Sequence, residues 1–135
     1  RAMIQQIKKV HTLKNKDYEY IKNEIEEIRD SIDGKTLKVI IETCYLSEQE
    51  IIKMTEICNE TFVNFIKTST GFGSGGASLE DIRLFKKHIG PNVKIKAAGG
   101  IRSITDMKAY IAEGCSRIGA SAAVELLKNH LNEEV

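Results

Sequence analysis

The chain has 135 residues and a formal net charge of +1, so it is long enough for one domain with a core and carries no strong field towards nucleic acid or membranes. A hydrophobic content of 41% and a charged content of 29% are ordinary for a globular protein. The absence of Trp and an aromatic content of 6% disfavour a base-stacking surface. We therefore expect a single domain over residues 1–135, with neither a nucleic-acid nor a membrane partner.

The cysteines suggest a reducing compartment. Cys44, Cys58 and Cys115 are far apart and form no C-x-x-C pair, and their odd number argues against a complete disulfide framework. The sequence shows no signal-peptide pattern, no apolar run of 18 residues and no lipidation motif. These features predict a cytoplasmic protein with reduced thiols.

From Asp17 onward, the hydrophobic pattern alternates between helical and strand periods. Capping serines precede three of the expected helices, and a glycine or a short turn ends most of them. The predicted helices cover 17–32, 47–60, 78–88, 103–114 and 121–132. The predicted strands cover 37–42, 62–68, 93–98 and 117–120.

Strands and helices that alternate with short connections imply parallel strands. Alternation along each strand places Lys38, Lys67 and Lys96 on one face and leaves the other face apolar. A sheet covered on both faces would be apolar throughout, whereas the interior of a barrel becomes polar near its catalytic end. The predicted fold is α/β: parallel (β/α) units that form about the C-terminal four strands and helices of a TIM (β/α)8 barrel, which is therefore incomplete.

Lys67 is the strongest catalytic candidate, because it lies near the carboxyl end of its strand, where barrel enzymes keep their reactive groups. A desolvated lysine beside a second cation has a lowered pKa, and only a neutral amine attacks a carbonyl. Lys96 occupies the corresponding place on the next strand, roughly 4.8 Å away, and is predicted to be that cation. A structural ion pair between Lys67 and Glu42 is the alternative.

Glycine-rich segments follow the strands at 93–98 and 117–120. Loops after the last two strands of such barrels often bind phosphate through backbone N–H groups, and small residues let the backbone approach the anion. A plain tight turn is the alternative for either segment alone. The predicted substrate- or phosphate-binding residues of these two segments are Gly99, Gly100, Gly119 and Ser121, and Thr70 and Gly71, after the strand at 62–68, are expected to help close the site.

Three segments resemble motifs of the deoxyribose-phosphate aldolase family: FIKTSTG at 65–71, VKIKAAGGIR at 93–102 and LKVIIET at 37–43. The resemblance covers about residues 13–131. It implies the reversible cleavage of 2-deoxy-D-ribose 5-phosphate, a small sugar phosphate, to D-glyceraldehyde 3-phosphate and acetaldehyde, with neither a metal nor an organic cofactor. On this resemblance Lys67 forms the Schiff base, Lys96 lowers its pKa and Lys38 lines the polar interior.

The sequence also departs from the family. A complete barrel needs roughly 215 residues or more. Residues 1–12 are an atypical N-terminal segment, in which Gln5 falls about where the family's fourth strand carries an assisting aspartate. Ala122 replaces a second serine in the last phosphate loop. Because half a barrel has two open sheet edges, we expect a homo-oligomer or a missing N-terminal half to close it.

Two other functions remain open. The loss of the assisting carboxylate at Gln5 suits a truncated, non-catalytic phosphate-binding homologue, since help with proton transfer is typically worth about 10²–10⁴-fold in rate. The segment AAGGIR at 97–102 also resembles the phosphate loop of FMN-binding barrels, but nothing else in the sequence resembles a redox site.

Overall fold

The computed structural model describes residues 2–6, 17–70, 74–120 and 128. The predicted helix at 121–132 and two predicted site residues, Gly71 and Ser121, lie outside this described part. The elements in chain order are β1 (Ala2–Gln6), α2 (Tyr18–Ser31), β2 (Thr36–Ile40), the short 3-10 helix η1 (Thr43–Tyr45), α3 (Glu48–Glu60), β3 (Phe65–Lys67), α4 (Leu79–His88), β4 (Lys94–Ala98), α5 (Ile104–Glu113) and β5 (Arg117–Gly119).

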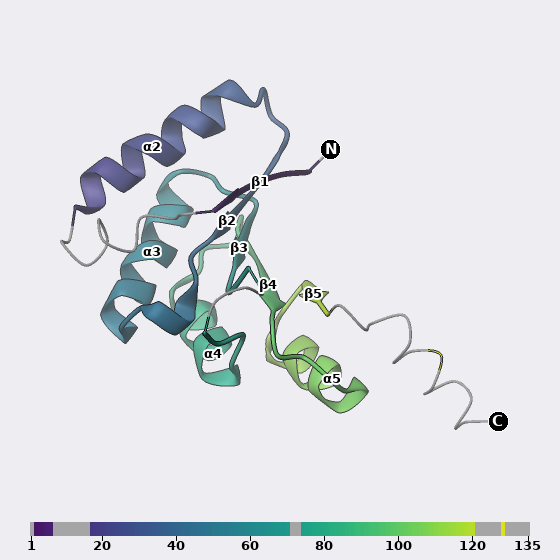
Figure 1. The fold of residues 1–135 in the computed structure, drawn as a ribbon. Helices are drawn as coiled ribbons and strands as arrows, with labels where there is room; N and C mark the ends of the chain where they lie inside the picture. Colours follow the sequence, from purple (N-terminus) through teal and green to yellow (C-terminus); the bar gives the residue numbers. More distant parts are fainter. Residues whose placement is uncertain (1, 7–16, 71–73, 121–127, 129–135) are drawn as a thin grey trace.

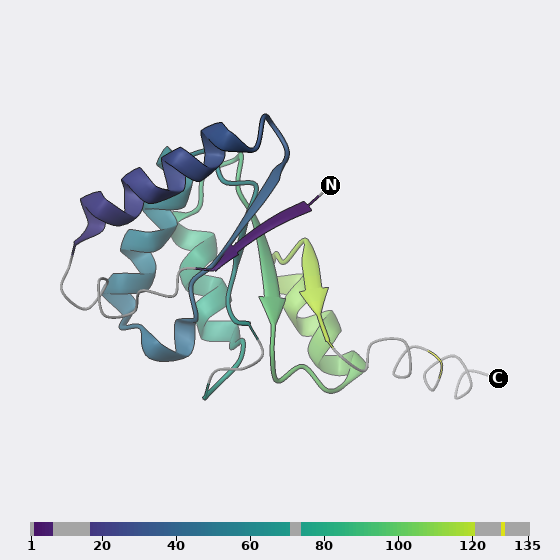
Figure 2. The same ribbon diagram turned by 45° about the horizontal axis from the view of Figure 1, so that its top comes forward.

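The five strands form one sheet in the order β1-β2-β3-β4-β5, and every neighbouring pair is parallel. The helices gather on one side of the strands (Figure 1), and the same arrangement is visible after rotation (Figure 2). Sequential parallel strands with helices along one side are the arrangement of consecutive units of a (β/α)8 barrel. The predicted fold class is confirmed, with one more strand than predicted.

Side-chain caps begin the helices where the sequence predicted them. The Ser47 hydroxyl accepts a hydrogen bond from the N–H of Glu50 at 3.2 Å, and the Glu50 carboxylate accepts one from the N–H of Ser47 at 2.8 Å. Ser78 and Ser103 cap α4 and α5 in the same way through their hydroxyls. Each cap satisfies an N–H group that has no partner within the helix, which fixes where the helix starts.

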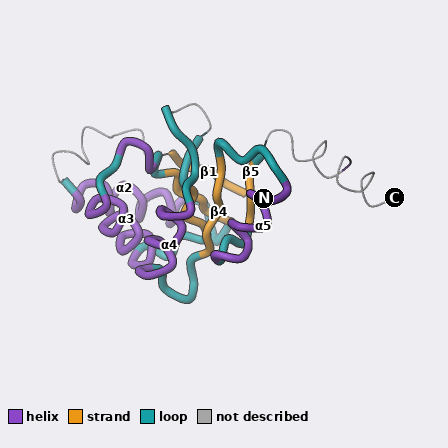
Figure 3. Tube along the Cα trace, turned by 90° about the horizontal axis from the view of Figure 1, so that it is seen from below, coloured by secondary structure: helices purple, strands orange, loops and turns teal. Residues whose placement is uncertain are grey.

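The apolar core lies between the sheet and the helices. Alternate strand residues face this core, as the sequence pattern predicted, and helix residues meet them from the other side. The tube view along the sheet shows helices and strands as two layers (Figure 3). Large side chains that are fully buried there include Ile21, Ile25, Leu37, Val39, Ile41, Met54, Ile66, Ile82 and Phe85.

Two predicted strands are shorter in the structure than the sequence predicted, one at its start and the other at its end. Phe62 was placed in a strand, but its φ of 56° is left-handed and its side chain is 67% exposed. It belongs to the turn that ends α3, where the N–H of Val63 donates to the carbonyl of Cys58 at 3.2 Å. Glu42 was placed at the end of a strand, yet its φ of 54° makes it the residue that precedes η1.

Strand β1 lies in the segment for which the sequence predicted no strand. Its register pairs Gln5 with Val39 and Gln6 with Ile40, and Ile40 pairs with Lys67. Paired residues of a ladder share a face, and Val39 is on the core face. Gln6 is therefore in register with the row that contains Lys67, and Gln5 with the neighbouring row of Val39 and Ile66.

Candidate active site

Lys67 on β3 and Lys96 on β4 are direct partners in the parallel ladder. Ile40 extends this row on one side and Arg117 on the other. Ladder partners share a face and lie on strands roughly 4.8 Å apart. The structure therefore brings together the two lysines singled out by the sequence, on the face of the sheet that lacks helices.

The surroundings of Lys67 favour its neutral amine. The side chain is partly buried, and this burial is the main cause of a pKa below the ordinary lysine value. The positive charges of Lys96 and Lys38 lower the pKa further, whereas the negative charge of Glu42 acts in the opposite direction. Each cation destabilises the protonated form of Lys67, which makes the amine more nucleophilic at neutral pH.

Lys38 on β2 also lies on the interior face. Only 6% of the residue is exposed, and its Nζ is 5.7 Å from the centre of the Phe65 ring. Burial lowers the pKa of Lys38, and the charges of Lys96 and Arg117 add to this effect. None of the ion pairs between described residues includes Lys38, and a buried lysine without a carboxylate partner is costly, so Lys38 contributes positive charge to this face at the expense of stability.

Arg117 was not predicted as a site residue. Its guanidinium carbon is 4.4 Å from the centre of the Phe65 ring, within the range of a cation–π contact. Because Arg117 is in register with Lys96, it places a third cation on the interior face beside Lys38 and Lys96. Strand alternation is the sequence signal that could have placed Arg117 on the interior face, but a strand of three residues is too short for an alternation pattern to be recognised.

Glu42 and Thr70 form a buried contact at the carboxyl end of the sheet. The Thr70 N–H donates to Oε1 of Glu42 at 2.9 Å, and the Thr70 hydroxyl donates to Oε2 at 2.6 Å. No ion pair within 4.0 Å joins Glu42 to Lys67 among the described residues, so the structural pairing of these two is not observed. Glu42 accepts from both of these Thr70 donors in the structure, and the part predicted for Thr70 in the substrate- or phosphate-binding site stays a prediction.

A second cross-strand contact fixes the ends of β3 and β4. The Thr68 hydroxyl accepts a hydrogen bond from the N–H of Ala98 at 3.1 Å and donates to the carbonyl of Ala98 at 3.2 Å. The Thr68 N–H also donates to the carbonyl of Lys96 at 3.2 Å. These bonds hold the two strands together immediately beyond the lysine pair.

The predicted glycines follow β4 and end β5. Gly99 and Gly100 have φ values of 83° and 72°, which L side chains rarely adopt, and a Cβ at Gly100 would meet nothing within 4 Å. A side chain at Gly76 would collide with the carbonyl of Gly99, so the loop before α4 passes close to this turn. The turn therefore requires glycine, and open space beside Gly100 leaves room for a ligand.

Two buried hydroxyls near the site lack a partner. Within the described part of the chain, Oγ of Ser69 and Oγ1 of Thr43 are buried without a hydrogen bond. Ser69 precedes Thr70, and Thr43 follows Glu42, so both flank the buried carboxylate contact. Unpaired buried hydroxyls are uncommon, because each loses its hydrogen bonds to water.

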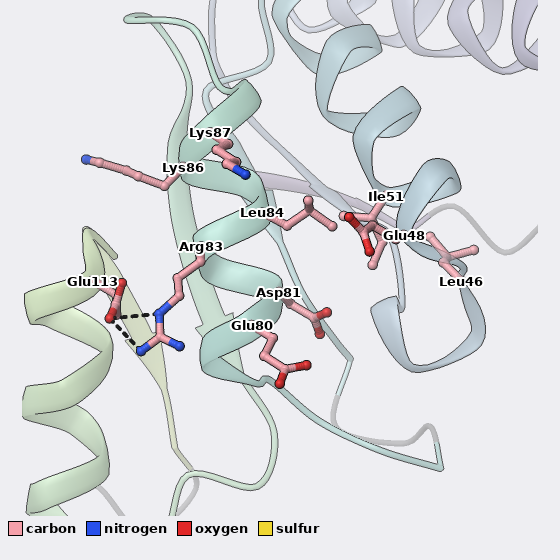
Figure 4. Close-up of a pocket in the computed structure, with 10 residues that line it drawn as sticks. All are labelled: Leu46, Glu48, Ile51, Glu80, Asp81, Arg83, Leu84, Lys86, Lys87 and Glu113. Carbon is pink, nitrogen blue, oxygen red and sulfur yellow. Dashed lines mark hydrogen bonds and ion pairs between the residues drawn. The ribbon is translucent and has the colours of Figure 1, made fainter.

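A hollow of about 700 Å³ lies on the opposite, helical side of the protein. Figure 4 shows α4 residues at its centre and the Arg83 guanidinium bonded to the Glu113 carboxylate at 2.9 and 3.0 Å. Its walls carry both acidic and basic side chains, and none of the lysines of the interior face lines it. We therefore place the candidate active site on the open face of the sheet, not in this hollow.

Among the described residues, no three His, Cys, Asp or Glu side chains come close enough to hold a metal ion. Nor does this part of the chain contain a helix with the length and apolar character needed to cross a bilayer.

The consecutive parallel β/α units and the lysine pair at the strand ends are features of barrel enzymes of the Schiff-base aldolase class. No protein-family profile matches the sequence. The deoxyribose-phosphate aldolase of Clostridioides difficile (strain 630) is 57% identical over 120 residues, which cover 89% of this chain and 55% of the relative. That of Clostridium botulinum (strain Eklund 17B / Type B) is 56% identical over 119 residues, with 88% and 54% covered.

Solved structures give the same result. A Coccidioides immitis protein proposed to be a deoxyribose-phosphate aldolase matches 96% of this chain with a TM-score of 0.89 and 31% identity, over 52% of its own length. The aldolase QR15 matches 90% with a TM-score of 0.81 and 42% identity, over 57% of its length. This chain is thus similar to the C-terminal part of deoxyribose-phosphate aldolases and spans about half the length of the curated relatives it matches.

Proposed function

We propose that this chain is the Schiff-base-bearing part of a deoxyribose-phosphate aldolase, which reversibly cleaves 2-deoxy-D-ribose 5-phosphate to D-glyceraldehyde 3-phosphate and acetaldehyde. The observation that carries this proposal is the pairing of Lys67 with Lys96 in one ladder row. Burial and the neighbouring cations lower the pKa of Lys67, as a nucleophilic amine requires.

In the proposed reaction, the neutral Nζ of Lys67 attacks the aldehyde carbon of the open-chain sugar, and loss of water leaves an iminium ion. The C2–C3 bond then breaks as the C3 hydroxyl loses its proton. C3 becomes the carbonyl carbon of glyceraldehyde 3-phosphate, and the bonding electrons form an enamine on Lys67. Protonation of the enamine and addition of water release acetaldehyde and regenerate the amine. The positive charge of Lys96 favours the uncharged form of Lys67 before the attack.

The phosphate group would bind through the backbone near the glycines. Gly100 is exposed, and a Cβ there would meet nothing within 4 Å, which supports an approach of the anion to the main chain of the turn at Gly99 and Gly100. Gly119, at the end of β5, is a further proposed contact. Gly71 and Ser121 remain proposed contacts from outside the described residues. Lys38 would contribute positive charge to the interior that receives the sugar phosphate.

Turnover requires a closed barrel in this proposal. The described sheet ends in two edge strands, β1 and β5, and the matched segment covers only 54% and 55% of two of the relatives. Either an N-terminal half or a second copy of the chain would cover the interior face and exclude water from Lys67. The three free thiols, Cys44, Cys58 and Cys115, fit action in the cytoplasm.

Reductive trapping tests the proposal. Incubation with 2-deoxyribose 5-phosphate and borohydride should attach the substrate carbon skeleton to Lys67, which tryptic mass spectrometry can locate. Lys67→Ala should abolish this label, whereas Lys94→Ala should retain it, because Lys94 is exposed at the start of β4. Full labelling of Lys67→Ala would reject the assignment.

A non-catalytic phosphate-binding homologue is the second candidate. It is favoured by the register of β1, which brings Gln6, and not a carboxylate residue, into line with Lys67 through Ile40. This candidate predicts that phosphate binds and protects the fold without release of acetaldehyde. A coupled acetaldehyde assay, run on the chain alone and with an added N-terminal half, distinguishes the two functions.

A further inference from the structure

Glu42 combines two features that each cost free energy. Its φ of 54° and ψ of 65° are left-handed, a conformation that a residue with a Cβ rarely adopts. Its side chain is a carboxylate that is only 5% exposed. Neither feature is needed to end a strand, since a glycine would adopt the same backbone conformation without strain. The contacts of the carboxylate must therefore account for its presence.

Those contacts all go to one residue. Thr70 donates its N–H to one carboxylate oxygen at 2.9 Å and its hydroxyl to the other at 2.6 Å. The shorter distance is typical of a charge-assisted O–H···O⁻ bond, which is stronger than a neutral one. Thr70 is three residues after Lys67, so Glu42 fixes the chain immediately beyond the lysine strand.

The backbone on either side of Glu42 is also attached to the lysine strand. The N–H of Ile41 donates to the carbonyl of Lys67 at 3.1 Å, and the N–H of Thr43 donates to the carbonyl of Thr68 at 2.9 Å. The backbone of Glu42 is thus held beside β3 by hydrogen bonds on both sides, and its carboxylate adds a further attachment, to Thr70. Three successive points of the segment from Lys67 to Thr70 are thereby fixed to one short stretch of chain.

We propose that Glu42 is a positioning residue for the Lys67 site: its carboxylate holds Thr70 and so fixes the segment Thr68–Thr70 that follows the lysine strand. This inference rests on the proposed function, because it assumes that Lys67 forms the Schiff base. It gives Thr70 a role through Glu42 instead of through phosphate.

The charge of Glu42 has a second consequence. Among the described residues, the charged groups that act on Lys67 are Lys96 on β4, Lys38 on β2 and Glu42 after β2, and of these three Glu42 favours the protonated amine. Because Thr70 holds the carboxylate, Glu42 acts on Lys67 without forming an ion pair with it. The carboxylate therefore favours the iminium cation on Lys67 and still leaves the amine free to react.

Acetaldehyde with cyanoborohydride provides the test, because the label on Lys67 can be measured by mass spectrometry over a range of pH and aldehyde concentration. Thr70→Val removes the hydroxyl and should raise the half-saturating aldehyde concentration about threefold or more, with an unchanged pH midpoint. Thr70→Ser should restore the original value. Glu42→Gln removes the charge and should move the midpoint to lower pH, because the protonated amine loses a favourable interaction.

A double variant tests whether Thr70 acts through Glu42. Glu42→Ala with Thr70→Val should label no worse than Glu42→Ala alone, whereas additive losses would show that Thr70 contacts the substrate directly. Glu50→Gln is the matched control, since Glu50 is also a buried carboxylate that accepts a backbone N–H, at the cap of α3. Glu50→Gln should change stability and leave the pH midpoint of labelling unchanged.

The outcomes separate the two proposals. No label on Lys67 in the unaltered chain would reject the proposed function and this inference with it. If Lys67 is labelled, and neither Glu42→Gln nor Thr70→Val changes the pH midpoint or the half-saturating aldehyde concentration, only the role of Glu42 is overturned. An equal shift of the midpoint in Glu50→Gln would overturn it too, because the effect would then be a general consequence of destabilisation.

Discussion

Gly119 lies against the side chain of Lys96: a Cβ added at residue 119 would be 3.4 Å from Cε of Lys96 and 3.2 Å from Cβ of Ala98. Because residue 119 has no side chain, β5 can lie close to the Lys96 stem and to Ala98 at this point. Gly119 was predicted to approach a phosphate, and the structure gives it this additional role beside the second lysine.

Gly119→Ala should crowd Cβ of Ala98 at 3.2 Å, so that β5 shifts relative to β4 and disturbs the neighbouring Lys96 stem. If this weakens the effect of the Lys96 charge on Lys67, the pKa of Lys67 rises, and reductive labelling at pH 7.5 should fall by about threefold to tenfold. Gly90→Ala is the control, because a Cβ there would meet the Asn59 side chain at 3.4 Å, an ordinary contact distance. Equal labelling of both variants would contradict the role of Gly119.

Lys96→Met should raise the pKa of Lys67. The charge of Lys96 destabilises the protonated form of Lys67, so its removal returns the amine towards the ordinary lysine value of 10.5. The pH midpoint of labelling at Lys67 should move upward, and labelling at neutral pH should decrease. Lys94→Met, two residues earlier on the same strand, should leave the midpoint in place. A midpoint that stays fixed in Lys96→Met would show that burial alone sets the pKa.

Lys38→Met should stabilise this chain at neutral pH by about 1 kcal/mol, because it replaces a buried, unpaired cation with an apolar side chain of similar length. The pKa of Lys38 is lower in the folded protein than in the unfolded chain. Between those two pKa values the unfolded chain binds more protons, so the contribution of Lys38 to the free energy of unfolding should rise with pH until about 10.5. Urea melts of both proteins from pH 7 to pH 10 should therefore show that the stability advantage of Lys38→Met narrows as the pH rises. A destabilised Lys38→Met would mean that the cation–π contact with Phe65 outweighs the burial cost.

Thr68→Val should destabilise the chain by about 1–3 kcal/mol, because the N–H and carbonyl of Ala98 both lose the Thr68 hydroxyl. Thr55→Val provides a comparison at an equally buried site, where the hydroxyl donates at 2.8 Å to the Ile51 carbonyl within the same helix. That carbonyl is in the helical ladder, so the second substitution should cost less. Urea unfolding followed by circular dichroism compares the two. Equal losses would show that the bonds to Ala98 add nothing to the β3–β4 contact.

The cysteines should differ sharply in reactivity. Burial raises the pKa of the Cys58 thiol to about 12 and that of Cys115 to about 11, whereas Cys44 is exposed. A disulfide reagent at pH 8 should therefore modify one thiol per chain rapidly in the folded state and three in denaturant. Rapid modification of two or more thiols in the folded protein would indicate that the helical layer opens.

The features that could be predicted from the sequence depend on neighbours along the chain. The capping box of Ser47 and Glu50 occurs within one helical turn, and it appears in the structure as predicted. The shared face of Lys67 and Lys96 followed from strand alternation and the parallel connection, both of which are short-range signals.

The features that could not be predicted depend on contacts between distant residues or on backbone conformation. Glu42 and Thr70 are 28 residues apart, and no local pattern links them. Strand β1 contains Gln5 and Gln6, whose polarity hides a strand that the ladder with β2 reveals. Phe62 has an apolar side chain typical of a strand, but the left-handed turn after α3 decides its conformation.

The strand order places Lys67 away from the edges of the described sheet. Lys67 is on β3, the middle strand of five, and Lys96 is on the adjacent β4. Fraying begins at the outermost strands, where backbone groups lack partners on one side. Lys67, the proposed nucleophile, is thus two strands away from either edge of the described sheet, so pairing at β1 or β5 can be lost while β3 keeps both of its neighbours.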